Sequence, residues 1–260
     1  MVFLGLSLIG LLCGSLGSVL VLKKQSLIGD GVSHSSLAGV TAAFLFFNSS
    51  QTAMLLGAFA AAMVAFFIIN LAKKVTTFSF ETIMAVVMSG MFGLGLCFMA
   101  AAQNAGGEHL QKLEEFVVGQ ENATLDVPII PIAVCTCAVA LLILLCFDYI
   151  KISAFDAYSA GLAKGGGAFA DFALFVLTIA AITLCLQTVG VVLMSALLIA
   201  PAVTARRFAK GFGQMVVLSA CVGAVTTAAA YGMVCLLPFL PAGPVIALLA
   251  CVPALLAVIK

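Results

Sequence analysis

The sequence predicts an all-α membrane protein whose chain crosses the bilayer about eight or nine times. Three observations predict this fold class: 64% of the 260 residues are hydrophobic, only 8% are charged, and the mean hydropathy is +1.30. A water-soluble domain of this length needs many more charged residues to cover its surface. We therefore expect residues 1–260 to form a single transmembrane domain.

The apolar runs give the expected helices in chain order. A crossing helix needs about 20 apolar residues. Runs of that kind cover residues 2–22, 27–47, 52–72, 82–102, 127–147, 168–205, 212–237 and 242–259. The run 168–205 is nearly twice as long as one crossing requires at about 1.5 Å per residue. We expect it to turn near residues 187–190 and to form two shorter helices.

The basic residues predict the orientation, because cytoplasmic connections retain Lys and Arg. If the N-terminus lies outside and the chain changes sides at every span, all basic residues except Lys112 fall inside. The scheme needs an even number of crossings between Lys164 and Arg206, which supports the turn within the long run. We therefore expect a multi-pass membrane protein with its N-terminus outside and its C-terminus in the cytoplasm.

Several functional classes conflict with the composition. The basic residues form short clusters between apolar runs, whereas nucleic-acid binding needs a basic stripe, so no nucleic-acid partner is expected. The nine cysteines lie in apolar runs and are interpreted as small hydrophobic residues. The sequence contains no G-x-x-x-x-G-K-[ST] phosphate loop, so we expect no ATP hydrolysis by this chain through that mechanism. We predict no catalytic residues and no permanently bound cofactor.

Asp30 and His34 are the ionisable residues that stand out within an apolar run. A charge near the bilayer centre costs a few kcal/mol unless it is paired or lies in a polar cavity. Their i, i+4 spacing places a carboxylate and an imidazole on one helical face, about 6 Å apart. These groups suit zinc, and also manganese or iron. Alternatively, the two side chains satisfy each other or cap the helix.

Two further considerations apply to this pair. Two chains related by a two-fold axis would supply two carboxylates and two imidazoles, enough for a tetrahedral shell. However, Asp30 lies only six residues after Lys24, so a straight helix would place it close to the cytoplasmic surface.

Glu81 and Asp171 lie at the inner ends of their runs, where water or a lysine can reach them, and we interpret both as boundary residues.

Two connections are long. The outer one, residues 103–127, carries five acidic residues and one lysine, and is either a surface that attracts cations or a docking partner, or a solvated loop. The inner one, residues 148–167, contains a possible short helix over residues 154–163 with Ser153 as its cap. It is either a handle for another protein or a linker.

Three segments resemble the ABC-3 family of metal permeases, and within it most closely the bacterial permeases for zinc uptake. They are LKKQSLIGDGVSHSSLAGV at residues 22–40, VGVVLMSALLIAPAVTARRFA at 189–209 and LPAGPVIALL at 240–249. The first contains, in order, paired basic residues, Gly-Asp, a His four residues after the Asp, and Gly-Val. Gly31 departs from the pattern, because many relatives have a larger residue there.

The resemblance implies a type II permease fold, like that of the vitamin B12 importer, and a role in ATP-driven import of a divalent metal. It also implies a location in the bacterial plasma membrane. It implies four kinds of partner: a second permease copy, two ATP-binding subunits inside, a solute-binding protein outside, and membrane lipid. It also implies that Asp30 and His34 line the metal path. The family's coupling helix, which sits in a groove of the ATPase, corresponds to Phe155, Asp156, Ala160 and Gly161.

The expected cargo is zinc, with manganese or iron as the alternatives. A different class, a transporter driven by an ion gradient or a channel, would need no ATPase. An intramembrane enzyme would need paired catalytic groups within the spans, and no nucleophile is clearly partnered with Asp30 and His34.

Overall fold

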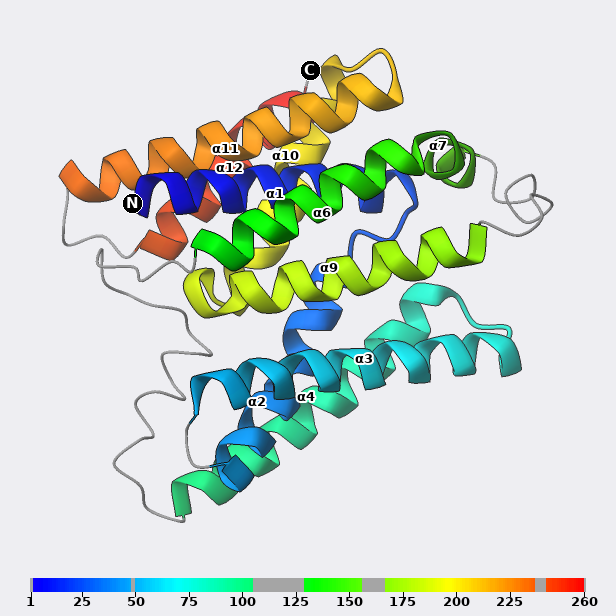
Figure 1. Cartoon of the computed structure of the whole chain (residues 1–260), viewed down its shortest axis with the longest axis vertical. Coiled ribbons are helices and arrows are strands. Elements are labelled where there is room, and N and C mark those ends of the chain that lie inside the picture. Colours follow the sequence, from blue (N-terminus) through cyan, green and yellow to red (C-terminus); the bar gives the residue numbers. More distant parts are fainter. Residues whose placement is uncertain (1, 48–49, 105–128, 156–166, 237–241, 260) are drawn as a thin grey trace. The chain divides into compact units, whose positions relative to one another are not determined.

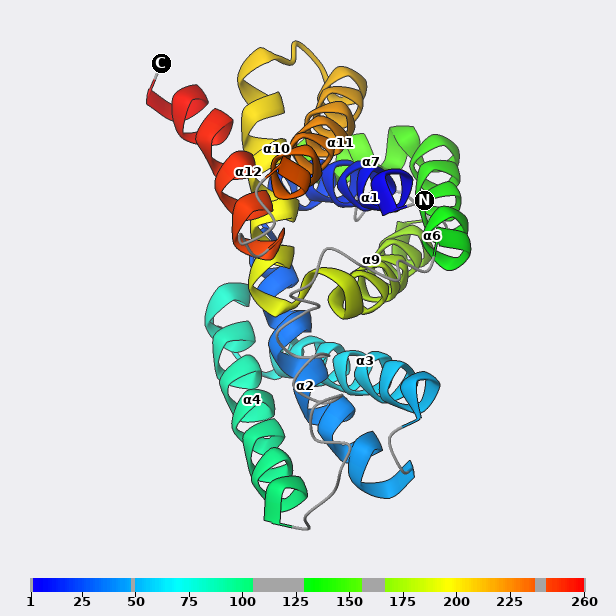
Figure 2. The same cartoon turned by 90° about the vertical axis from the view of Figure 1, so that its left-hand side faces the viewer.

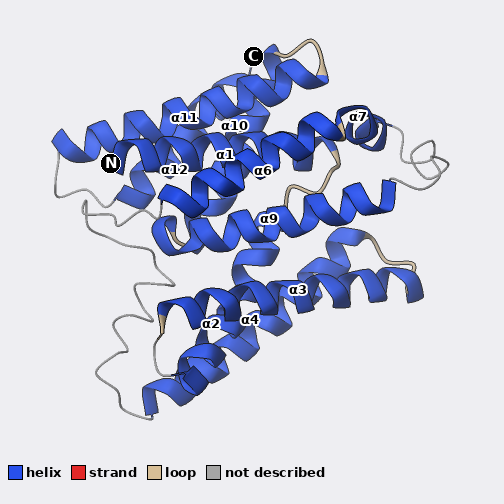
Figure 3. Cartoon of the chain, in the orientation of Figure 1, coloured by secondary structure: helices blue, strands red, loops and turns tan. Residues whose placement is uncertain are grey.

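The computed structural model describes residues 2–47, 50–104, 129–155, 167–236 and 242–259, and within these ranges every regular element is a helix (Figure 3). The helices are α1 (Val2–Leu22), α2 (Ile28–Phe47), α3 (Gln51–Val75), α4 (Phe80–Asn104), α6 (Ile129–Leu145), α7 (Phe147–Phe155), α9 (Gly167–Val189), α10 (Val191–Phe208), α11 (Phe212–Leu236) and α12 (Ala242–Ile259). The all-α prediction is confirmed, and each expected apolar segment forms a helix.

The predicted turn within the long run 168–205 is also confirmed. Helix α9 ends at Val189 and α10 begins at Val191. Gly190 between them has a φ of 80°, a conformation that glycine adopts without the clash of a Cβ atom. Its N–H donates to the carbonyl of Leu186 at 2.9 Å, so the glycine closes the end of α9.

By length and composition, five helices in the described part of the chain can cross a membrane: α1, α3, α4, α11 and residues Phe169–Leu186 of α9. The number rises to six if α6 and α7, which are bent by 76° at their junction, form one broken span. Helix α2 is more polar because Asp30, His34 and several serines lie in its first half. The total of eight or nine crossings stays a prediction.

The helices pack as two compact units. Unit 1 contains Met1–Ser26, Glu121–Ala181 and Leu193–Lys260, and unit 2 contains Leu27–Gln120 and Ile182–Val192. Neither unit is one continuous stretch of chain. The single transmembrane domain expected over residues 1–260 stays a prediction.

Helix α1 is the buried centre of unit 1 and lies between α11 and α6 (Figures 1 and 2). Glycines on α1 allow α11 to approach at backbone distance: a Cβ atom on Gly10 would lie 2.3 Å from the carbonyl oxygen of Gly223. One turn further along, the Ser219 hydroxyl donates to the carbonyl of Gly14 at 2.6 Å. Small residues thus permit close packing of α1, as in other membrane helix pairs.

Unit 2 is built around α2, which packs against both α3 and α4 (Figure 1). Gly39 of α2 faces Gly57 of α3, and Gly95 of α4 packs against the backbone of Ala38. The paired positions show that α2 runs antiparallel to α3 and parallel to α4. This agrees with a chain that changes sides at each span, although it does not show which side is the cytoplasm.

Candidate metal site

Asp30 and His34 lie in the first two turns of α2, within unit 2. Both side chains are partly exposed, whereas Gly31, Val32 and Ser33 between them are buried. The helical geometry predicted from the i, i+4 spacing is present, so both groups lie on one partly open face of α2. Asp30 is the third residue of the helix, as expected for a position near one end of the span.

The structure does not pair the two groups with each other. Among the described residues, no hydrogen bond or ion pair joins Asp30 to His34. The imidazole instead meets the ring of Phe92 from α4 edge-on, with ring centroids 5.0 Å apart and an interplanar angle of 86°. This T-shaped contact is a favourable aromatic geometry. It limits the orientations of the His34 ring and leaves both groups able to bind a ligand.

The serines around the pair use their hydroxyl groups within the helix. Ser33 donates to the carbonyl of Gly29 at 2.8 Å, Ser36 to that of Ser33 at 2.8 Å, and Ser35 to that of Gly31. Such bonds satisfy a buried hydroxyl inside the helix. The carboxylate and the imidazole are therefore the side-chain groups of this turn that remain for a cation.

Asp30 and His34 by themselves provide two side-chain ligands. The described residues contain no group of three or more His, Cys, Asp and Glu side chains that could hold a metal ion. An open groove of about 360 Å³ runs further along α2 between Gly39, Gly57 and Leu94. Its walls are apolar, so it cannot replace the water around an ion.

Gly31 lies on the same turn and packs against α4. A Cβ atom placed there would lie 3.2 Å from the sulfur of Met84, the flexible part of a buried side chain. The space is tight but adaptable. Gly31 is therefore not required for close backbone contact, in contrast to Gly39.

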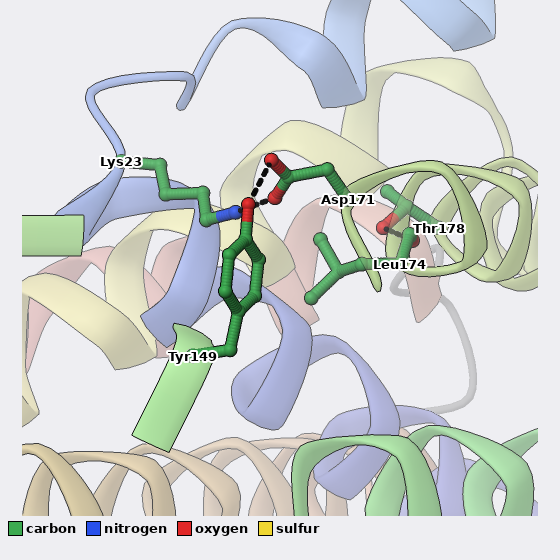
Figure 4. Close-up of polar contacts among 5 residues, drawn as sticks. All are labelled: Lys23, Tyr149, Asp171, Leu174 and Thr178. Atoms are coloured by element: carbon green, nitrogen blue, oxygen red, sulfur yellow. Dashed lines mark hydrogen bonds and ion pairs between the residues drawn. The ribbon is translucent and has the colours of Figure 1, made fainter. Parts of the chain in front are cut away.

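Asp171, expected to be a boundary residue within reach of a lysine, forms an ion pair with Lys23 in unit 1 (Figure 4). Its second oxygen accepts a hydrogen bond of 2.8 Å from the Tyr149 hydroxyl of α7. The phenol is the donor in this bond, because an ionised carboxylate only accepts. Sequence reasoning did not identify Tyr149.

Glu81 is exposed in the first turn of α4, as expected for a boundary residue.

Residues 147–155 form α7, a helix that the sequence did not predict, so Ser153 lies inside a helix and does not cap one. Most of the helix expected over residues 154–163 lies outside the described residues. The ring of Phe147 packs against that of Phe212, with ring centroids 5.0 Å apart, and Ile150 is buried. Phe155 ends α7 and is exposed, whereas Asp156, Ala160 and Gly161 lie outside the described residues, as does most of the outer acidic connection.

Comparison with known proteins gives a consistent result. The sequence profile of the ABC 3 transport family matches residues 1–260. The chain is 36% identical to the manganese transport system membrane protein MntC of Bacillus subtilis, over 86% of this chain and 52% of that protein, so it spans about half the length of this relative. It is 32% identical to the zinc transport system membrane protein TroC of Treponema pallidum, over 95% of this chain and 83% of that protein.

A solved structure shares the fold. PsaBC from Streptococcus pneumoniae, determined in complex with Fab, superimposes with a TM-score of 0.81 and 26% sequence identity, over 98% of this chain and 88% of that chain. The similarity extends over nearly all of the chain, so it includes the helices of both units.

Proposed function

The chain belongs to the ABC 3 transport family, and from this premise we propose that it is the permease subunit of an ATP-driven importer for divalent metal ions. Zinc is the first candidate cargo, with manganese or iron as alternatives. The permease subunit itself carries out no bond chemistry, and ATP hydrolysis belongs to a separate subunit.

The metal assignment is supported by similarity to two relatives, one a zinc and one a manganese transport system membrane protein. It is also supported by the donor set. A carboxylate and an imidazole from each of two chains would form a four-ligand shell of two oxygen and two nitrogen atoms, which suits zinc. Manganese accepts more oxygen ligands, including water, and the same pair does not exclude it.

The observation that carries the proposal is the state of Asp30 and His34. They share a partly open face of α2, and neither a hydrogen bond nor an ion pair joins the two side chains. An ionisable residue within a membrane-spanning segment is by default a candidate for an ion path. We propose that this pair contacts the metal ion during its passage.

The proposed assembly contains two permease copies, two ATP-binding subunits on the cytoplasmic side and a solute-binding protein outside. The connection 148–167, with Phe155, Asp156, Ala160 and Gly161, would dock in the ATPase. The outer surface, including residues 103–127, would receive the solute-binding protein. ATP binding would move the docked segments and open the path alternately to each side. In this proposal the N-terminus lies outside and the C-terminus in the cytoplasm.

The test is uptake of radioactive zinc by proteoliposomes that contain the permease, its ATPase and the binding protein. Asp30→Asn and His34→Gln keep side-chain size but weaken metal binding. We expect each to reduce uptake by at least about tenfold, because even the outer partners of metal ligands are worth about 10–100-fold in affinity. Glu81→Gln removes an exposed charge elsewhere in unit 2 and is the matched control.

Each result has a defined meaning. Both site variants should still copurify with the ATPase, since they lie outside the docking connection. Normal uptake in both variants would reject the ligand assignment. Uptake by the permease alone, without the ATPase, would support a gradient-driven transporter or a channel instead. Parallel assays with manganese and iron(II) identify the cargo.

A further inference from the structure

We propose that Asp171 is a positioning residue for energy coupling: its carboxylate ties α7, the first part of the connection 148–167 that docks the ATPase, to α9 and to the end of α1. This inference rests on the proposed function, because it takes the connection 148–167 as the site where the ATPase acts. The residues involved all belong to unit 1.

Three separate elements meet at this one carboxylate (Figure 4). Oδ1 of Asp171 pairs with Nζ of Lys23, which is 148 residues away in sequence. Oδ2 accepts the hydroxyl proton of Tyr149, 22 residues away, at 2.8 Å. Both oxygen atoms are thus used, and each connects α9 to a different part of the chain.

Besides this bond, α7 packs against α1 and α6. Ile150 is the buried residue among its nine, and Phe147 anchors the start through Phe212. A helix this short is marginal without tertiary contacts. The bond from Tyr149 to Asp171 is therefore a substantial part of what fixes α7 in place. This bond is a direct side-chain link by which a displacement of α7 passes to α9.

At the other end of the cluster, the Lys23 side chain is largely buried and its backbone is held by hydrogen bonds. Its side chain is 9% exposed, compared with 47% for Asp171. The end of α1 has the hydrogen bonds of a Schellman motif, from Gln25 N–H to the carbonyl of Leu20 and from Lys24 N–H to that of Val21. The lysine amine therefore lies at a fixed point, and a largely buried cation there needs the carboxylate as its partner.

The first experiment measures attachment without any transport assay. Tyr149→Phe removes only the hydroxyl, and Tyr231→Phe, on α11, is the matched control. Amide hydrogen exchange in α7 should rise about three- to tenfold in Tyr149→Phe, as expected for the loss of one hydrogen bond that limits local opening. Unchanged exchange in α7, or an equal rise in Tyr231→Phe, would overturn the proposed attachment.

The second experiment measures coupling in the reconstituted complex as metal ions taken up per ATP hydrolysed. Tyr149→Phe should lower this ratio about twofold or more while ATP hydrolysis continues. Asp171→Asn should lower it further. Asp171→Ala leaves Tyr149 without an acceptor, so Tyr149→Phe/Asp171→Ala should match Asp171→Ala alone, because both changes break the same link. A ratio equal to wild type in Tyr149→Phe, or independent additive losses, would contradict the inference.

A third variant separates folding from coupling. Asp171→Asn leaves the Lys23 cation without its partner, and adding Lys23→Met removes that cation while keeping the aliphatic stem. The pair Lys23→Met/Asp171→Asn should restore the yield of folded protein but not the transport ratio. Recovery of both would show that the cluster is only structural. If the wild-type complex takes up no divalent metal, the proposed function fails, and the exchange experiment still decides whether Asp171 holds α7.

Discussion

Gly10 of α1 and Gly223 of α11 are in direct backbone contact: a Cβ atom on Gly223 would lie 2.1 Å from the carbonyl oxygen of Gly10. Since neither contact atom can move without moving its helix, Gly10→Ala and Gly223→Ala should destabilise the protein by about 1–3 kcal/mol or more. Thermal unfolding in detergent measures this. Gly232→Ala, on the same helix α11 with nothing within 4 Å of its Cβ position, is the control and should unfold like wild type.

Helix α2 offers a matched pair of glycine substitutions. A Cβ atom on Gly39 would lie 1.9 Å from the carbonyl oxygen of Gly57, whereas one on Gly31 would meet only the thioether of Met84. We expect Gly39→Ala to prevent correct packing of α2 on α3. Gly31→Ala should fold and transport normally, since Met84 can shift and alanine favours the helix by about 0.5–1 kcal/mol. Loss of folded protein in Gly31→Ala would show that this turn tolerates no side chain.

Phe92→Leu tests the orientation of the candidate ligand His34. Leucine keeps most of the apolar volume but removes the ring edge that meets the imidazole at 5.0 Å. An aromatic pair of this kind is worth about 0.5–1.5 kcal/mol, so the KM for metal uptake should rise about two- to tenfold with a nearly unchanged maximal rate. Phe98→Leu, further along α4, is the control. An equal rise in KM for both variants would mean that Phe92 does not orient the imidazole of His34 for metal binding.

The sequence was sufficient to predict features that depend on local pattern. The apolar runs predicted the helices, the length of run 168–205 predicted the break that Gly190 makes, and the i, i+4 spacing predicted that Asp30 and His34 share a face. These properties follow from helix geometry alone.

Features that depend on contacts between distant residues were not predictable in the same way. The partners of Asp171 are separated from it by 148 and 22 residues, so no local pattern indicates them. Helix α7 was not predicted, because it is supported by the packing of Phe147 against Phe212, which is 65 residues away in the sequence. The metal cannot be read from Asp30 and His34 because two donor atoms do not define a coordination shell.

Substitutions of Lys24 test whether the backbone at the end of α1 is strained. Lys24 has a φ of 56°, the left-handed region, at the position of the Schellman motif that glycine usually occupies. A side chain there costs about 1 kcal/mol, so Lys24→Gly should raise the free energy of unfolding by up to about that amount. Lys24→Ala removes the same charge but keeps the Cβ atom, and should therefore stay within about 0.5 kcal/mol of wild type. Thermal unfolding of the two variants in one detergent compares them directly. If alanine stabilised the protein as much as glycine does, the gain would come from the lost charge, and the backbone of Lys24 would carry no strain.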